Sequence, residues 1–213
     1  MLNLSDMIQN INEFDQKALT WDADVQKQVR ARIVGEAIRE FLPPSKKLAA
    51  MEYGCGTGLL SFNLSADFET IYLADTSDGM LQVLSSKITS SGISNFKPIH
   101  LDLSNSHTFP KESIDVIFSL MTLHHVPDTS ALLREFFTLL RPNGMILLAD
   151  LEKEDGTFHP EGTTGIHYGF DRDELREKCD AAGFNGVGFT SVFTMQKKNR
   201  EYPVFLLHAK RNK

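Results

Sequence analysis

The sequence predicts an α/β fold built on a seven-stranded, mostly parallel sheet, and three observations indicate it. From residue 48 to residue 151, short apolar runs of strand length alternate with segments of helical periodicity, which is the pattern of successive βαβ units. An amphipathic helical segment precedes this region, and two β-rich runs joined by a polar turn follow it. We therefore expect a parallel core with an N-terminal helical cap and an antiparallel terminal β-hairpin.

The predicted elements follow one another in regular order. Apolar residues recur at helical spacing from Asp22 to Phe41, and Pro43 and Pro44 end this pattern. Strands are predicted at 48–53, 70–74, 97–101, 114–119 and 145–151, and helices from residue 59 and at 78–90 and 130–140. After a loop at 152–170, a capping sequence predicts another helix, which Gly183 ends, and then hairpin strands at 186–195 and 202–209.

Composition narrows the class of protein. A chain of 213 residues with 41% hydrophobic content can bury one core, so a single domain is expected. The net charge of -6 argues against a nucleic-acid partner, because such binding depends on Lys and Arg. Cys55 and Cys179 lie too far apart in sequence to indicate a disulfide framework, which favours a cytoplasmic setting. No apolar run has membrane-spanning length, so no membrane association is expected.

The first predicted strand runs directly into a glycine-rich loop, MEYGCGTGL at residues 51–59. A sharp turn from strand to helix presents free backbone N–H groups, and glycines let a ligand approach them closely. The dinucleotide pattern G-x-G-x-x-G would place its third glycine at Leu59, which does not fit. Glu52 would repel a pyrophosphate and attract an ammonium group or ribose hydroxyls. The loop therefore favours a ligand other than a dinucleotide, and a tight turn without a ligand is the alternative.

The segment from Glu52 to Gly58 has the form E-x-G-x-G-x-G and resembles the first motif of class I S-adenosylmethionine (SAM)-dependent methyltransferases. DTSDGML at 75–81 is similar to the motif that ends the second strand of that family, where the acidic residue binds the ribose. Asp102 falls where the family places an Asp near the adenine, and LRPNG at 140–144 is similar to its L-[KR]-P-G-G turn. The resemblance covers residues 48–151 and implies a Rossmann-like fold, SAM as cofactor and methyl transfer.

The resemblance also implies the division of the chain and a set of binding residues. Residues 1–44 would form the cap, 45–151 the cofactor-binding core, and 152–213 a substrate-side loop, helix and hairpin. The cofactor residues would be Glu52, Gly54, Gly56, Gly58, Asp75, Thr76, Met80, Asp102, Leu103 and Ser119.

The acceptor is expected to be a small molecule. The methyl group on a sulfonium is already electrophilic, so positioning and water exclusion could supply most of the catalysis. The fourth strand ends in SLMT at 119–122 and not in the [DN]-P-P-[YF] sequence that resembles methyltransferases of nucleic acids and proteins.

Histidine is the natural candidate if a general base is needed near neutral pH. His125 and His167 are the catalytic candidates, and Trp21, His124 and Tyr168 are the substrate candidates. The alternatives are structural: the paired histidines cap the strand, His167 and Tyr168 pin the loop, and Trp21 packs in the core.

Two further features are interpreted as structural. The acidic residues Asp150, Glu152, Glu154 and Asp155 are expected to form a solvated run, and no metal is predicted because the downstream Asp-Asn pair of metal-dependent relatives is missing. Cys55 is expected to pack within the loop. Two other functions stay open: a SAM-binding regulatory protein without turnover, and a nicotinamide-dependent oxidoreductase, which Glu52 and Leu59 disfavour.

Overall fold

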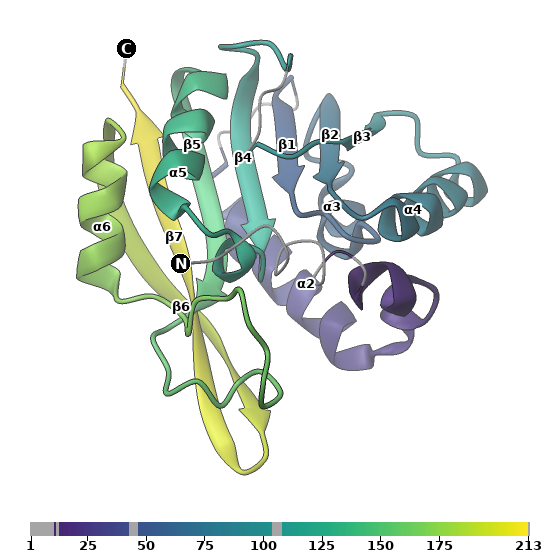
Figure 1. Cartoon of the computed structure of the whole chain (residues 1–213). Coiled ribbons are helices and arrows are strands. Elements are labelled where there is room, and N and C mark those ends of the chain that lie inside the picture. Colours follow the sequence, from purple (N-terminus) through teal and green to yellow (C-terminus); the bar gives the residue numbers. More distant parts are fainter. Residues whose placement is uncertain (1–10, 12, 43–46, 104–107, 213) are drawn as a thin grey trace.

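Seven strands form one sheet in the order β3-β2-β1-β4-β5-β7-β6 in the computed structural model, which describes residues 11, 13–42, 47–103 and 108–212 (Figure 1). The strands are β1 Ala49–Tyr53, β2 Thr70–Asp75, β3 Phe96–His100, β4 Ile114–Leu120, β5 Leu140–Leu151, β6 Phe184–Lys197 and β7 Arg200–Arg211. Strands β1 to β5 pair in parallel, whereas β7 is antiparallel to both β5 and β6. The predicted Rossmann-like, mostly parallel sheet with an antiparallel terminal hairpin is confirmed.

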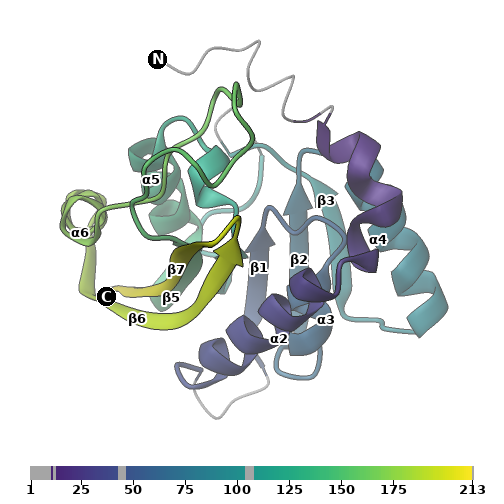
Figure 2. The ribbon, with the colours of Figure 1, turned by 90° about the horizontal axis from the view of Figure 1, so that it is seen from below.

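Helices cover both faces of this sheet (Figures 1 and 2). The helices are α2 Val25–Arg39, α3 Leu59–Leu64, α4 Asp78–Ser91, α5 Thr129–Leu139 and α6 Arg172–Ala181, with the short 3-10 helices η1 Ala18–Ala23 and η2 Leu123–His125. One core cluster joins the sheet to α5 and α6, and the other joins it to α2, α3 and α4. Strands covered on both sides need apolar residues on both faces, which explains why the parallel strands read as continuous apolar runs.

The N-terminal cap differs from its predicted form. The helix expected from Asp22 begins at Val25, because the Asp24 side chain accepts a hydrogen bond from the backbone N–H of Gln26 and caps the helix there. Asp22 lies in η1, which is a separate turn. The expected stop at Pro43 and Pro44 and the first ten residues of the cap lie outside the described residues.

The turn predicted before the fifth strand is a bulge inside a longer strand. Strand β5 pairs Leu140 with Ile114 and then Met145 with Val116, so residues 141–144 bulge from the ladder. Asn143 adopts a φ of 67°, the left-handed region that asparagine tolerates better than most residues. The terminal hairpin turns at Lys198 and Asn199, which have φ values of 51° and 60° and confirm the predicted polar turn.

The carboxyl ends of β1 and β4 lie side by side, with register partners up to Glu52 and Phe118. The chain leaves β1 toward β2 on one side, while β4 continues toward β5 on the other, so the order of strands reverses between them. Open α/β sheets bind ligands at such a reversal. Among the helices of the described residues, none is both long and apolar enough to span a membrane.

Candidate active site

A cavity of about 1090 Å³ opens at this end of the parallel strands. Its floor comes from the loops that follow β1, β2 and β4, and its walls come from the N-terminal cap, helix α2, the loop after β5 and the tip of the terminal hairpin. Segments that are far apart in the sequence therefore enclose one space large enough for two small molecules.

The glycine loop presents bare backbone to this cavity. Gly54 and Gly56 have φ values of 67° and 52°, a region that strains any residue with a Cβ atom. A Cβ on Gly54 would lie 2.2 Å from the Cγ2 atom of Thr122, so this glycine is needed for packing. A Cβ on Gly56 would find its nearest atoms, on Met80 and Trp21, only at 3.9 Å. The backbone at Gly56 therefore borders open space, as close approach of a ligand requires.

Asp75, at the end of β2, faces the same space. Its Oδ2 atom accepts a hydrogen bond of 2.6 Å from the backbone N–H of Gly56, and its Oδ1 atom accepts one of 2.9 Å from Ser77. Burial raises the pKa of Asp75, and these backbone hydrogen bonds oppose that effect. The remaining lone pairs of the carboxylate can accept hydrogen bonds from a diol, as expected for a ribose.

Glu52 departs from the role predicted for it. Its side chain is only 2% exposed and accepts hydrogen bonds from the backbone N–H and the hydroxyl of Ser61 on α3. Burial raises the pKa of Glu52 to about 8, even though the bonds from Ser61 oppose this shift. Glu52 therefore lies beside the loop as expected, but its raised pKa favours the neutral acid near pH 7 and not the charged carboxylate that the sequence suggested.

Most of the predicted cofactor residues line the cavity. They are Glu52, Gly54, Gly56, Asp75, Thr76, Met80 and Asp102. Gly58, Leu103 and Ser119 do not line it, for reasons of packing. A Cβ on Gly58 would lie 2.7 Å from Leu84, so this glycine lets α3 pack against α4, and the other two side chains are buried. Cys55 is also buried, which raises the pKa of its thiol well above the usual value and supports the predicted packing role.

Two carboxylates fasten the N-terminal cap to the core. Asp15 accepts hydrogen bonds from the Ser77 hydroxyl at 2.6 Å and from the Gly79 backbone N–H at 2.9 Å. Asp22 accepts hydrogen bonds of 2.5 Å from Thr57 and from Lys87. These contacts hold Trp21 against the glycine loop, so the predicted substrate candidate lies on the side of the cavity that carries the predicted cofactor residues.

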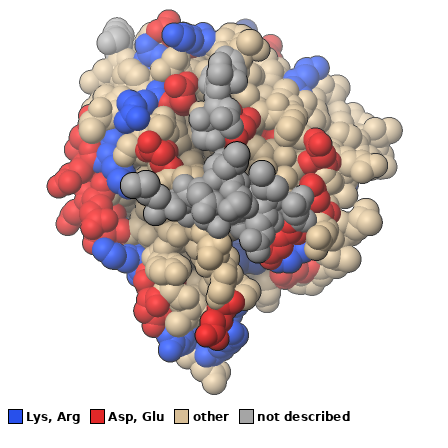
Figure 3. Space-filling model, viewed as in Figure 1, with Lys and Arg blue, Asp and Glu red and all other residues tan. Residues whose placement is uncertain are grey.

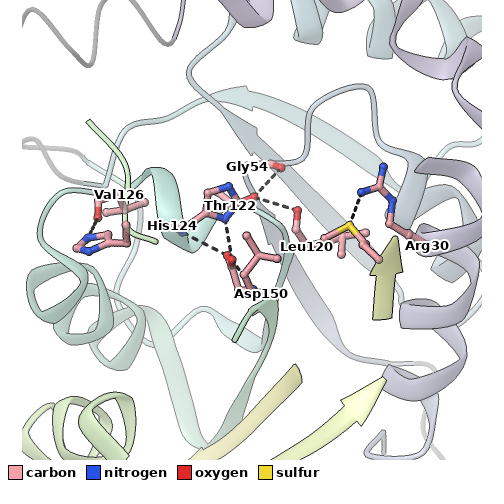
Figure 4. A network of polar contacts seen from close by, with 10 residues as sticks. Arg30, Gly54, Leu120, Thr122, His124, Val126 and Asp150 are labelled. Atoms are coloured by element: carbon pink, nitrogen blue, oxygen red, sulfur yellow. Dashed lines mark hydrogen bonds and ion pairs between the residues drawn. The ribbon is translucent and has the colours of Figure 1, made fainter. Parts of the chain in front are cut away.

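The fourth predicted motif carries a histidine that a buried carboxylate orients (Figure 4). The Nδ1 atom of His124 lies 2.7 Å from Oδ1 of Asp150, and the backbone N–H of His124 donates to Oδ2 of the same carboxylate. Asp150 is fully buried, so the prediction of a solvated acidic run is wrong at this position. A carboxylate at Nδ1 favours the tautomer that carries its proton there and leaves Nε2 as the basic nitrogen.

Two more histidine rings gather around His124. The ring centroids of His125 and His159 lie 4.1 Å and 5.1 Å from that of His124. Burial is the largest effect on both, and it holds the pKa of His125 well below its usual value and lowers that of His159 to about 4. The Nδ1 atom of His125 and the Nε2 atom of His159 are buried and have no hydrogen-bond partner among the described residues. Both rings are therefore neutral near pH 7 and present unused nitrogen atoms.

The family model described as "Methyltransferase domain" matches residues 51–148, which include the glycine loop, Asp75, Asp102 and the His124 segment. These residues belong to the class I SAM-dependent methyltransferase family.

Relatives of known name agree with this family. The chain is 33% identical over 162 residues to phosphoethanolamine N-methyltransferase 1 of Arabidopsis thaliana, a match that covers 71% of this chain and 32% of that protein. Several of the curated relatives that the chain matches are much longer, and the matches span 32% to 51% of their length.

Solved structures show the same fold. A putative methyltransferase of Haloferax volcanii, in complex with the Trm112 methyltransferase activator, superimposes with a TM-score of 0.78 at 17% identity, over 94% of this chain and 98% of that one. Phosphoethanolamine N-methyltransferase 2 of Haemonchus contortus, in complex with SAM, has a TM-score of 0.70 at 16% identity, over 84% of this chain and 52% of that one.

His167 and Tyr168 do not line the cavity of this methyltransferase domain. The backbone N–H of His167 donates to the carbonyl of His124, and its Nε2 atom lies 2.9 Å from the carbonyl of Val126 (Figure 4). Tyr168 is 52% exposed and packs over Gly156. These contacts agree with the structural alternative for both residues, and the catalytic candidate His167 does not line the cavity.

Several cavity residues had no recognisable signal in the sequence. The loop after β5 contributes Phe158 and His159, α2 contributes Arg30, and the hairpin tip contributes residues 193–197. None of them belongs to a methyltransferase motif, and they meet only because α2 packs against β6. A polar residue at the tip of an amphipathic hairpin looks like ordinary surface when the sequence is read alone.

Proposed function

We propose that the protein is an enzyme that transfers the methyl group of SAM to a small-molecule acceptor. One observation carries the proposal: the cavity that contains the glycine loop and Asp75 also contains a separate polar wall with His124, His125 and His159. A cofactor and an acceptor could therefore lie in one enclosed space, which is what direct group transfer requires.

The residues that would hold SAM follow from their positions in this cavity. Asp75 would accept hydrogen bonds from the ribose hydroxyls, and Met80 and Asp102 would contact the adenine. The open backbone at Gly56 and the buried acid of Glu52 would face the rest of the molecule. SAM supplies an electrophilic methyl group on a positively charged sulfur. The protein needs no nucleophile of its own for this chemistry.

The work left to this chain is positioning, water exclusion and removal of a proton. The cap, fastened through Asp15 and Asp22, would shield the reacting groups from water. The Nε2 atom of His124, which makes no hydrogen bond with the described residues, would accept a proton from the acceptor. We thus assign the base to His124 and give His125, the earlier candidate, the role of a neutral hydrogen-bonding partner.

A small-molecule acceptor agrees with the surface and with the relatives. Acidic and basic side chains are interspersed over the face shown in Figure 3, and the net charge is -6, which does not favour a nucleic-acid substrate. The Arabidopsis relative is named for methylation of phosphoethanolamine, a small molecule. We further propose that the chain acts as one domain in the cytoplasm, in keeping with two buried free cysteines.

An acceptor screen with SAM carrying a labelled methyl group tests the function. We expect S-adenosylhomocysteine and a labelled product to form together when a suitable hydroxyl, amine, thiol or carboxylate compound is supplied, and to be lost in Asp75→Ala. If SAM binds tightly but no member of a broad panel of acceptors is methylated, the result favours a SAM-binding regulatory protein without turnover over an enzyme. Stabilisation by NAD and not by SAM would instead favour an oxidoreductase.

A further inference from the structure

Two basic side chains line the cavity without a carboxylate partner. Arg30 on α2 and Lys197 on β6 both face this space. No carboxylate of the described residues forms a salt bridge with either of them. The neighbouring Lys17 and Lys27 are different, because Glu13 and Asp24 neutralise them. The charge of Asp24 acts on Arg30 and that of Glu154 acts on Lys197, but neither carboxylate forms a salt bridge with these cations. Both cations can therefore still pair with an anion.

Arg30 makes two hydrogen bonds with the described residues, and one of the acceptors is weak. Its Nε atom donates to the carbonyl of Gln26 at 3.1 Å, and its Nη1 atom lies 2.8 Å from the sulfur of Met195 on β6 (Figure 4). A thioether sulfur is a poor acceptor, and a guanidinium group has five N–H bonds, so three of them make no hydrogen bond with the described residues. The planar edge of the group can bind two oxygens of one anion at once.

Lys197 follows two residues after Met195 on β6, the residue whose sulfur contacts Arg30, so both cations belong to the same part of the wall. The Nζ atom of Lys197 donates to the carbonyl of Phe158 at 2.5 Å and lies 4.7 Å from the centre of the Phe158 ring. The ammonium group has three N–H bonds, so two of them make no hydrogen bond with the described residues. Burial, followed by the charges of Lys198 and Arg30, lowers the pKa of Lys197. A bound anion would offset the repulsion between these two positive charges.

The two ends of the cavity carry opposite charge. Asp75 and Asp102 mark the end that would receive the cationic cofactor, whereas Arg30 and Lys197 belong to the wall formed by α2 and the hairpin. In the view of Figure 4, Leu120 and Thr122 lie between Arg30 and His124. A molecule anchored at Arg30 would therefore extend past the end of β4 toward the histidine.

We propose that Arg30 and Lys197 bind an oxyanion, a carboxylate or a phosphate, that belongs to the methyl acceptor. This inference rests on the proposed methyl-transfer function and specifies its substrate class. The anion anchors one end of the acceptor, and the opposite end carries the atom that receives the methyl group.

Paired probes of equal shape and different charge test the inference. The protein is first saturated with S-adenosylhomocysteine. 4-Hydroxybenzoate and 4-hydroxybenzamide are then titrated into it in separate calorimetric experiments. Phenyl phosphate forms a third arm that distinguishes a phosphate from a carboxylate preference. We expect the matching anion to bind at least about tenfold more tightly than the amide, a difference of about 1.4 kcal/mol.

Variants identify the residues. Arg30→Gln and Lys197→Gln should each remove most of the preference for the anion, whereas Arg30→Lys should keep part of it. Arg32→Gln, on the same helix but paired with Glu36, and Lys198→Gln, next to Lys197 and exposed, serve as matched controls and should keep the preference. Thermal melting verifies that each variant is folded.

The outcomes separate the two proposals. If S-adenosylhomocysteine does not bind, the proposed function is wrong. If it binds but the anions bind no better than the amide, or if none of the three probes binds, the oxyanion site is wrong while the function stands. Equal loss of the preference in the control variants would also contradict the assignment.

Discussion

The Nδ1 atom of His124 lies 2.7 Å from Oδ1 of Asp150, and both side chains are almost fully buried, with His124 at the edge of the cavity. His124 lies in η2, just after the end of β4, whereas Asp150 is next to last in β5, so the parallel pairing of these two strands brings the residues together. The backbone N–H groups of His124 and Leu151 also donate to this carboxylate. Asp150 therefore acts as a positioning residue that fixes the orientation of the imidazole ring.

Replacing Asp150 by Asn tests this role. The amide keeps the volume but removes the charge and the fixed tautomer, so we expect kcat to fall by about 10- to 100-fold with little change in the KM for SAM. Asp155→Asn is the control, because Asp155 lies in the same acidic stretch but is exposed and paired with Arg200. An unchanged kcat in Asp150→Asn would show that the contact between His124 and Asp150 is structural and does not contribute to catalysis.

Gly56→Ala tests whether the space beside Gly56 holds a ligand, and Gly92→Ala controls for the backbone strain that alanine introduces. Both Gly56 and Gly92 have positive φ values, 52° and 71°, so alanine at either position should cost about 1 kcal/mol of stability. Only the methyl group at Gly56 would project into the cavity. We expect Gly56→Ala to weaken S-adenosylhomocysteine binding at least about tenfold, and Gly92→Ala to leave it unchanged. Equal affinities for the two variants would place the ligand elsewhere.

The buried acid of Glu52 makes stability depend on pH. Its pKa is about 8 in the folded protein and ordinary in the unfolded chain, so the folded state holds a proton that the unfolded state releases above about pH 4.5. The stability of the wild type should therefore fall as the pH rises from about 4.5 to 8, relative to Glu52→Gln, which does not titrate. Urea denaturation at pH 5 and pH 8 measures the difference between the two proteins. A difference that is constant with pH contradicts a raised pKa.

The cap should loosen when Asp15 is removed. Asp15→Ala loses two hydrogen bonds to the start of α4, which we expect to weaken the docking of the cap by about 1–3 kcal/mol. Because Trp21 is the sole tryptophan, its fluorescence reports on this region alone. Faster quenching of Trp21 by acrylamide is the expected result, with the exposed Gln16→Ala as control. Identical quenching in both variants would show that these bonds do not hold the cap.

The fold was predictable because its signals are local. Each parallel strand is a short apolar run, each helix has its own periodicity, and the turns carry residues such as Gly183 and Asn199 that suit their backbone angles. The cofactor-binding residues were predictable for the same reason, since Gly54, Gly56 and Asp75 belong to contiguous motifs. Element boundaries were less accurate, because caps such as Asp24 and the bulge before Met145 depend on details of hydrogen bonding.

The acceptor side was only partly predictable because it is assembled from distant segments. His124 was recognised as a candidate, but its partner Asp150 resembled a member of an exposed acidic run until β4 and β5 were paired. His167 has the same side chain as His159, yet one fastens the loop and the other faces the cavity, a difference that no periodicity reveals in an irregular loop. Arg30 and Lys197 come from a helix and a hairpin that are separated by most of the chain.

Calorimetric titration with S-adenosylhomocysteine tests the central claim most directly, namely that the glycine loop and Asp75 form a SAM site. We predict one binding site in the wild type, loss of binding in Asp75→Ala with a native circular dichroism spectrum, and unchanged binding in Asp78→Ala, where an exposed carboxylate of α4 is removed. Unchanged affinity in Asp75→Ala, or heat of binding with NAD and none with S-adenosylhomocysteine, would contradict the account.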